Sequence, residues 1–273
     1  MRRRWGVVRI VAAAALAALL GVGQAAGAPG KRVSPGGPTR VRTHGLAPTN
    51  CFTSGSGSTL FAFCVSDDGV ITSIESPDGV EHINVPPLPE EGYQVCVNNT
   101  VVGQQATSGG SGFGPSTIVQ PNGTGTFPLR IVRSTTDGAL RLAQDFSWSP
   151  GTRTITIAET LTNTSGGALQ DVRLFRMFLG KIDGDFGDDV FDSSIRSVWG
   201  RDVDALGLTA TTLGRFAVTT FQPFGQINPP PPCSIPQPSG PSNPDTWFGE
   251  AAYVFWSLAK GASPTVRFQY RVF

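Results

Sequence analysis

The residues with the most evident chemistry are the aspartates between positions 183 and 204. Seven of the 20 acidic residues of the chain lie in this stretch, opposed only by Arg196 and Arg201. Close carboxylates repel one another unless a cation neutralises them, and Ca²⁺ does so with oxygen ligands. The alternative interpretation is a solvated acidic loop that pairs with arginines. The predicted calcium ligands are Asp183, Asp185, Asp188 and Asp189.

Glu159 is the second residue of chemical interest. It falls in phase with Ile155, Ile157 and Leu161, so in a strand its carboxylate lies on the apolar face. There it either pairs with an arginine, which is the commoner arrangement, or lines a cleft. Two carboxylates in a cleft can hydrolyse a glycosidic bond, and Glu159 and Glu250 are the candidates for that role. We favour the arginine pair and assign no catalytic residue.

Nucleophilic catalysis by serine finds no support. The chain has two histidines, His44 and His82, and a Ser-His-Asp arrangement would depend on His82. Ser111 follows two glycines, but Phe113 stands where a nucleophile elbow needs its second glycine. Tryptophans could stack on sugars if exposed, although aromatic residues in alternating strands mostly belong to the core. The tryptophans concerned are Trp148, Trp199, Trp247 and Trp256.

The four cysteines, Cys51, Cys64, Cys96 and Cys233, form an even set that predicts two disulfides in an exported chain. Four cysteines allow three pairings. We expect Cys51–Cys64 together with Cys96–Cys233, because the first bridge is local and the second fastens a proline-rich segment to the fold. A zinc site would require closely spaced cysteines such as C-x-x-C, and the sequence has none.

The first 28 residues predict export. Arg2, Arg3 and Arg4 precede an apolar run at residues 10–22, and small residues follow at 25–28, which are the three parts of a cleaved signal peptide. The apolar run is too short to anchor the chain in a bilayer. We expect a secreted, periplasmic or extracellular protein without a membrane span in its mature chain, in a compartment where disulfides persist.

Composition narrows the partners and the fold class. From Asn50 onward, 13 basic and 20 acidic residues give a net charge of −7, which argues against nucleic acid as a partner. The 34 glycines and 22 prolines favour turns over long helices. No window has a sustained helical period.

Alternating apolar and polar residues predict an all-β fold, a single large antiparallel β-sandwich or its larger form, a supersandwich. Turns with Asp-Gly, such as Asp68-Gly69 and Asp137-Gly138, supply the positive φ that a tight hairpin needs. The last strand should pair within a sheet, because an unpaired terminal strand leaves a sticky edge. The clearest expected strands are residues 60–65, 70–74, 127–133, 140–148, 153–163 and 266–272.

The expected domain organisation has three parts. Residues 1–28 form the signal peptide, residues 29–49 a flexible leader rich in proline and glycine, and residues 50–273 the β-sandwich. The proline-rich stretch 228–244 cannot be a central strand, because proline donates no ladder hydrogen bond. It is either an extended surface loop pinned by Cys233 or a polyproline ligand for a partner domain.

Several segments resemble an uncharacterised family of exported, β-rich bacterial proteins. In that family an arginine is commonly followed by an Asp-x-Asp motif, to which Arg176, Asp183 and Asp185 correspond loosely. The resemblance implies export and an all-β body. The chain is more distantly similar to the large sandwich of galactose-mutarotase-like proteins, whose histidine pair has no counterpart here. The matching segments are SPDGVEHINV (76–85), EGYQVC (91–96), TTDG (135–138), TLTNTSG (160–166) and FRMFLGKIDGDFGDDVFDSS (175–194).

These observations predict an exported, non-catalytic β-sandwich that binds a glycan or another cell-surface component. No cofactor is required, and the aspartate cluster is a candidate site for a structural calcium ion. One alternative is a carbohydrate-active enzyme that uses carboxylates in a concave sheet face, and another is a structural envelope protein.

Overall fold

The structure is a computed structural model, and it describes residues 50–83, 91–107, 109–179, 190–194, 196–201, 204–215, 217–223, 233 and 247–273. Within these residues the regular structure consists of β-strands and one short 3₁₀ helix, which confirms the all-β prediction. The elements are β1 Asn50–Ser54, η1 Gly57–Thr59, β2 Phe61–Val65, β3 Ile71–Glu75, β4 Glu91–Val97, β5 Thr100–Ala106, β6 Gly109–Ser111, β7 Thr117–Val119, β8 Leu129–Ser134, β9 Leu140–Ser147, β10 Thr154–Asn163, β11 Leu169–Leu179, β12 Val190–Ser193, β13 Ser197–Arg201, β14 Ala205–Ala210, β15 Ala217–Pro223, β16 Trp247–Leu258 and β17 Thr265–Val272.

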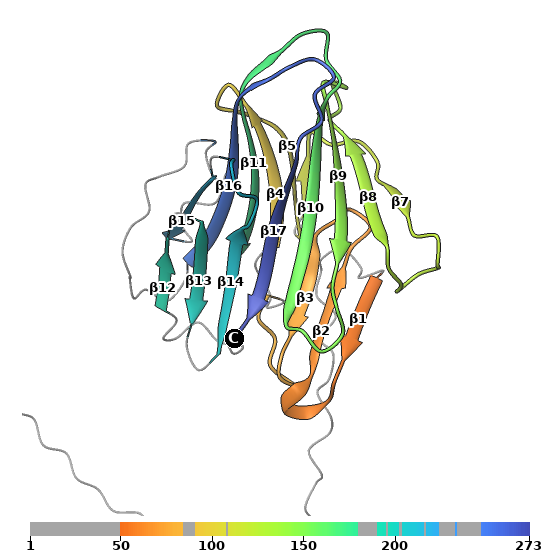
Figure 1. Cartoon of the computed structure of the whole chain (residues 1–273), viewed down its shortest axis with the longest axis vertical. Coiled ribbons are helices and arrows are strands. Elements are labelled where there is room, and N and C mark those ends of the chain that lie inside the picture. Colours follow the sequence, from red (N-terminus) through yellow and green to blue (C-terminus); the bar gives the residue numbers. More distant parts are fainter. Residues whose placement is uncertain are drawn as a thin grey trace, which may run out of the picture. The chain divides into compact units, whose positions relative to one another are not determined.

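The strands form three antiparallel sheets. An eight-stranded sheet has the order β12-β13-β14-β17-β10-β9-β8-β7, and a six-stranded sheet has the order β15-β16-β11-β4-β5-β6. Figure 1 shows the eight-stranded sheet in front of the six-stranded one, with the three-stranded sheet β1-β2-β3 at the lower end of the picture. The expected antiparallel β-sandwich is therefore confirmed.

The predicted hairpins and the predicted place of the last strand are also confirmed. Strand β2 pairs with β3, and Gly69 in their turn has φ +83°, a conformation that favours glycine. Strand β8 pairs with β9 across the turn that contains Gly138. Strand β17 lies between β14 and β10, so both of its edges are hydrogen-bonded.

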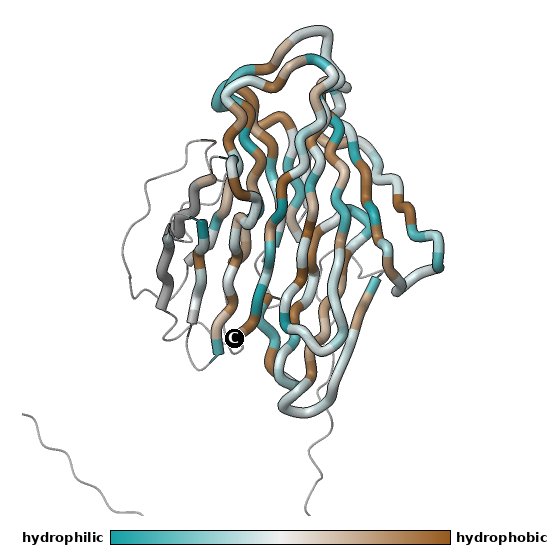
Figure 2. Tube along the Cα trace, viewed as in Figure 1, coloured by the Kyte–Doolittle hydropathy of each residue, from teal (hydrophilic) through white to brown (hydrophobic). Residues whose placement is uncertain are grey.

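Alternation along the strands creates the core. In β10 every second residue from Ile155 to Asn163 is buried, and the threonines between them are half-buried. Figure 2 shows the same alternation of hydrophobic and hydrophilic residues along the strands of both large sheets. The main core contains residues of all three sheets, for example Phe63, Leu174 and Phe268, each with no exposed surface. Burial of these apolar side chains is the main driving force for the stacking of the sheets.

Both predicted disulfides are present. Cys51 and Cys64 are directly opposite residues on β1 and β2, whereas Cys96 on β4 is joined to Cys233, 137 residues later in the chain. Cys96 and Cys233 belong to a second, smaller buried cluster together with Phe175, Met177 and Ala252. This cluster lies on the face of the six-stranded sheet that is turned away from the main core, because its residues alternate with those of the main core.

None of the helical structure in the described part of the chain is long and apolar enough to cross a membrane. Apart from Cys233, the proline-rich stretch 228–244 lies outside the described residues, as do the signal peptide and the leader.

The two disulfides should differ in their effect on stability. In the chain-entropy model, the longer loop of Cys96–Cys233 stabilises the fold by about 5 kcal/mol and the loop of Cys51–Cys64 by about 3 kcal/mol. The double variant Cys96→Ala/Cys233→Ala should therefore lose about 2 kcal/mol more free energy of unfolding than Cys51→Ala/Cys64→Ala. Urea denaturation of both double variants measures the difference, and an equal or larger loss in the Cys51 and Cys64 variant would contradict the entropic account.

Candidate functional site

Arg176 is a charged residue at the centre of the sandwich. It lies on β11, between β16 and β4 in the six-stranded sheet, in phase with the core residues Leu174 and Phe178. This alternation directs its side chain into the space between the sheets, where it has no exposed surface. Because a buried guanidinium keeps its charge, acceptors have to be supplied by the strands around it.

The guanidinium has hydrogen-bond acceptors in all three sheets. Its Nε donates to Oε1 of Glu91 on β4 at 2.7 Å. Its Nη1 donates to Oε1 of Glu159 on β10 and to Oε1 of Gln144 on β9, both at 2.8 Å. Its Nη2 donates at 2.8 Å to the backbone carbonyl of Gly69, in the turn between β2 and β3.

Glu91 is held by further donors. The hydroxyl of Tyr270 on β17 donates to Glu91 Oε1 at 2.8 Å, and the backbone N–H of Ile71 on β3 donates to Glu91 Oε2 at 2.7 Å. Burial, together with the negative charge of Glu91, holds the pKa of Tyr270 well above its usual value. The phenol therefore stays a neutral donor at physiological pH.

The turn at Gly69 fits this cluster closely. A Cβ atom at this position would lie 2.2 Å from the side-chain nitrogen of Gln144, which is far inside van der Waals contact. Glycine is thus required both by the positive φ and by the approach of the turn to Gln144. The same approach brings the carbonyl of Gly69 within reach of Arg176.

Glu159 has a partner for only one of its oxygens. Oε1 accepts from Arg176, whereas Oε2 is buried without a hydrogen-bond partner among the described residues. Burial raises the pKa of Glu159 from 4.5 to about 7, because the attraction of Arg176 only partly offsets the loss of hydration, and Glu91 adds to the rise. The arginine pair that the sequence favours for Glu159 is present, and the carboxylate has no exposed surface.

Glu250, the other carboxylate considered for catalysis, lies on the opposite face of the same sheet. Its neighbour Ala251 stands opposite Arg176 and belongs to the main core, so Glu250 points to the side of Ala252 and the smaller cluster. Only 1% of Glu250 is exposed. Because the six-stranded sheet separates them, Glu159 and Glu250 do not form a pair of catalytic carboxylates.

The predicted calcium ligands Asp183, Asp185, Asp188 and Asp189 lie outside the described residues, so calcium binding stays a prediction. Within the part of the chain that the structure describes, no group of His, Cys, Asp and Glu side chains is arranged to hold a metal ion. His82 is buried, and its Nε2 is 2.6 Å from the carbonyl oxygen of Ser76.

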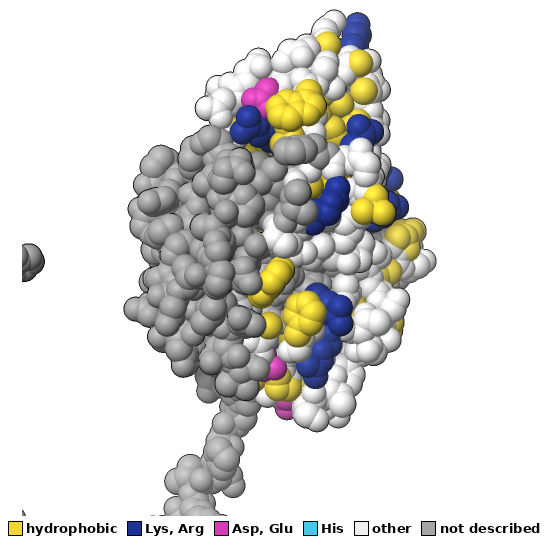
Figure 3. Space-filling model, turned by 60° about the vertical axis from the view of Figure 1, so that its left-hand side comes forward, with side chains coloured by type: hydrophobic (Ala, Val, Ile, Leu, Met, Phe, Trp, Pro, Cys, Tyr) yellow, Lys and Arg dark blue, Asp and Glu magenta, His cyan; other side chains and the backbone are white. Residues whose placement is uncertain are grey.

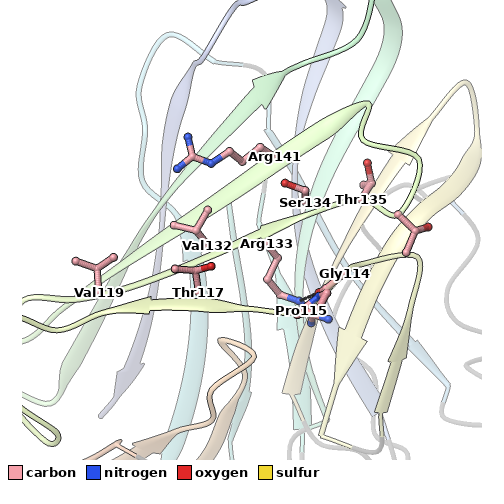
Figure 4. A pocket seen from close by; sticks show the side chains of 10 residues that line it. Gly114, Pro115, Thr117, Val119, Val132, Arg133, Ser134, Thr135 and Arg141 are labelled. Carbon is pink, nitrogen blue, oxygen red and sulfur yellow. Dashed lines mark hydrogen bonds between the residues drawn. The ribbon is translucent and has the colours of Figure 1, made fainter.

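An accessible depression of about 580 Å³ lies over β7, β8 and β9 on the outer face of the eight-stranded sheet. We call it the β7–β9 groove. Figure 4 shows its lining side chains on these neighbouring strands and on the segment that leads into β7. The lining residues are Gly114, Pro115, Thr117, Val119, Val132, Arg133, Ser134, Thr135, Thr136 and Arg141.

Arg133 lies on the inner face of β8, in phase with the buried Leu129 and Ile131, and links the segment that leads into β7 to the six-stranded sheet. Its Nε donates to the carbonyl of Gly114 at 3.0 Å, and its Nη1 donates to Oε1 of Gln105 at 2.6 Å and to the Tyr93 hydroxyl at 3.3 Å. Only 8% of Arg133 is exposed. Arg141, in contrast, is exposed, and it forms no ion pair in the described part of the chain.

Sequence reasoning identified Glu159 but not the residues that complete its cluster. Glu91 is in phase with the core residues Tyr93 and Val95, and Gln144 is in phase with Leu142 and Phe146. Each is a polar residue in an apolar series, which is the signal that singled out Glu159. The β7–β9 groove has no comparable signal, because its residues come from three strands and a loop.

Comparisons with known proteins support the fold. No family model and no curated protein matches the chain. A bacterial glucoamylase solved in complex with acarbose matches with a TM-score of 0.58 and 9% identity, over 88% of this chain and 34% of the glucoamylase. This likeness shows a shared sandwich fold, and the chain spans about a third of the glucoamylase.

Two further solved structures are similar over most of this chain. The Slr1438 protein of Synechocystis sp. PCC 6803 has a TM-score of 0.47 and 7% identity, over 86% of this chain and 99% of that protein. A putative aldose 1-epimerase of Klebsiella pneumoniae has a TM-score of 0.34 and 10% identity, over 78% of this chain and 76% of that protein. At these TM-scores neither adds to the fold assignment.

The raised pKa of Glu159 predicts a pH-dependent stability. The neutral carboxyl is favoured in the folded state, so its contribution is complete below about pH 4.5 and is lost as the pH rises through about 7. Glu159→Gln keeps an acceptor for Arg176 and cannot ionise, so its free energy of unfolding should fall less over this range. Urea denaturation of both proteins across the pH range measures the difference, and parallel curves would contradict the assignment.

Removal of the central cation should be costly. Arg176→Met leaves Glu91 and Glu159 buried without their partner, and the free energy of unfolding should fall by about 3–5 kcal/mol. The matched control is Arg130→Met, because the ion pair of Arg130 with Asp145 has side chains 44% and 42% exposed and should contribute at most about 1 kcal/mol. Equal losses in the two variants, measured by urea denaturation, would argue against a central role for Arg176.

Proposed function

We propose that the protein is an exported, non-catalytic β-sandwich that binds a glycan in the β7–β9 groove. The observation that carries this proposal is the groove itself, an open depression of about 580 Å³. Pockets for small ligands typically measure roughly 300–1,000 Å³ and combine apolar walls with a few polar groups. The β7–β9 groove has a volume in this range and is lined by both apolar and polar side chains.

The lining of the groove suits a sugar. Thr117 and Ser134 supply hydroxyls that both donate and accept hydrogen bonds, and Arg141 supplies a planar set of donors. Val119 and Val132 add apolar surface for the C–H groups of a sugar ring, and 48% of Val119 is exposed. The bonds of Arg133 to Gly114 and Gln105 hold the segment that leads into β7 in place, and a preorganised lining lowers the entropy cost of binding.

Binding is favoured over hydrolysis by the position of the carboxylates. Glycosidases of the usual kind place two carboxyl groups roughly 5–9.5 Å apart around the scissile bond. None of the described residues that line the β7–β9 groove is Asp or Glu, and Glu159 is enclosed in the core by Arg176. The likeness to a glucoamylase complexed with acarbose is consistent with a sugar-related role. It is a likeness of fold alone.

Export is supported by the two disulfides of the described chain, because such bonds persist in oxidising compartments. The proposal also includes two features of the chain: its signal peptide is cleaved, and it binds calcium through Asp183, Asp185, Asp188 and Asp189. Analysis of the N-terminus of exported protein tests the first, and the thermal midpoint with and without EDTA tests the second.

The glycan proposal is tested by an array of glycans probed with the exported protein and with two variants. Ser134→Trp fills the β7–β9 groove from an exposed position of β8 and should weaken binding by at least about tenfold, the equivalent of 1.4 kcal/mol. Thr53→Trp places the same ring at an exposed position of β1, in the three-stranded sheet and outside the groove, and it should bind like the wild type.

The same preparation is assayed for the release of reducing ends from each bound glycan. No release is expected. Hydrolysis would contradict the non-catalytic part of the proposal and favour a carbohydrate-active enzyme. Equal binding by both tryptophan variants would show that the glycan binds outside the groove. The absence of any bound glycan would contradict the whole proposal.

A further inference from the structure

The outer face of the eight-stranded sheet carries a series of exposed arginines. On β17 the residues Val266, Phe268, Tyr270 and Val272 are buried, while Arg267 and Arg271 between them are exposed. Arg141 is exposed at the corresponding face of β9, beside the β7–β9 groove. The pleat of the sheet therefore places all three guanidinium groups on the solvent side.

These three arginines lack ionic partners within the described residues. On this face the ion pair that the structure contains joins Arg130 to Asp145, and none involves Arg141, Arg267 or Arg271. The described charged side chains of this face are mainly positive, although the chain from Asn50 onward has a net charge of −7, from 13 basic and 20 acidic residues. In the view of Figure 3, basic side chains are spread over the described surface and hydrophobic ones lie beside several of them.

We propose that the β7–β9 groove is one end of a track along Arg141, Arg267 and Arg271, and that the ligand of this track is an acidic polysaccharide. The inference rests on the proposed glycan-binding function and adds the chemical class of the glycan. Unpaired guanidinium groups bind carboxylates and phosphates in a planar, two-point manner.

Hydroxyl and amide groups lie on β10 and β17 near the arginines. Thr160 on β10 pairs with Thr265 on β17, and their hydroxyls are 2.7 Å apart. Gln269, two residues from both Arg267 and Arg271, donates to the hydroxyl of Thr156 at 3.1 Å. Each of these groups keeps a free lone pair for a sugar hydroxyl, so the track offers hydrogen bonds as well as charge.

Aromatic rings lie at the end of the track that is farthest from the groove. Arg271, Gly207 and Trp199 stand side by side on β17, β14 and β13. A Cβ atom at Gly207 would be 3.3 Å from the ring of Phe273, so that ring lies over the sheet at this point. The guanidinium of Arg271 is 4.5 Å from the centroid of the same ring, and 57% of Phe273 is exposed. A sugar ring can stack on such a surface.

The spacing of the arginines favours a polysaccharide over a nucleic acid. Arg267 and Arg271 are four residues apart on one strand, about 14 Å at 3.4 Å per residue. A nucleic-acid strand carries a phosphate about every 3.4 Å, which this sparse series would leave mostly unneutralised against an acidic protein body. A polymer with anionic groups on some of its sugars fits the spacing better.

The test uses partly methyl-esterified polygalacturonate, which carries carboxylates on some of its sugars, and the fully methyl-esterified form, which has the same sugar backbone without the charge. The exported protein should bind the charged form more tightly, and raised ionic strength should weaken that binding only. Arg141→Gln, Arg267→Gln and Arg271→Gln should each weaken it by about two- to fivefold, and the triple variant by on the order of tenfold or more. Lys260→Gln removes an equal charge from the exposed turn after β16 and should leave it unchanged.

The outcomes distinguish a failure of the track from a failure of the proposed function. Equal binding of both polymers, unaffected by the triple variant, overturns the track and leaves glycan binding intact. Binding of polyphosphate or single-stranded DNA as tight as that of the charged form of polygalacturonate overturns the assignment to a polysaccharide. Binding of neither polymer, with a glycan array that stays blank, removes both proposals. An unchanged circular dichroism spectrum of the triple variant ensures that a loss of affinity is not a loss of fold.

Discussion

The ion pairs of Arg176 with Glu91 and Glu159 lie where the three sheets meet, and the arrangement of the sheets depends on them. Transfer of an unpaired charge from water into the core costs several kcal/mol. That cost is offset only when β4, β9, β10 and the turn after β2 all present their acceptors to one guanidinium. A shift of any of these strands by one residue would point the acceptor to the other face. The cluster thus selects one register of the sheets over the alternatives.

The same cluster explains the titration of Glu159. One cation faces two carboxylates. The negative charge of Glu91 is the better stabilised of the two, because Tyr270 and Ile71 also donate hydrogen bonds to it. Glu159 accepts a hydrogen bond from Arg176 at one oxygen, and its second oxygen has no partner among the described residues. A proton on Glu159 removes the excess negative charge, which is the physical cause of its raised pKa. The buried charged groups therefore serve to stabilise the fold.

The outer face of the eight-stranded sheet has the opposite character. There, arginines and threonines alternate with the core residues of the same strands, and Arg141, Arg267 and Arg271 are exposed to water. Their charges are available to a ligand because no carboxylate of the described chain neutralises them. Arginine is structural at position 176, where it is buried, whereas the exposed arginines carry the recognition that we propose, and the environment of each residue makes the difference.

The local pattern of the sequence determined the strands and the hairpin turns, because alternation and turn chemistry act over a few residues. Of the three possible disulfide pairings we favoured the one that the structure contains, but the approach of Cys96 and Cys233, 137 residues apart, depends on the tertiary structure. The local pattern also placed Glu159 on a buried face and favoured an arginine as its partner. Which arginine this is, and that Glu91, Gln144 and Tyr270 join it, was decided only by the tertiary structure, which brings together residues up to 179 positions apart. The β7–β9 groove and the arginine track likewise follow from the order of strands in the sheet, since long-range pairing brings β9 within two strands of β17.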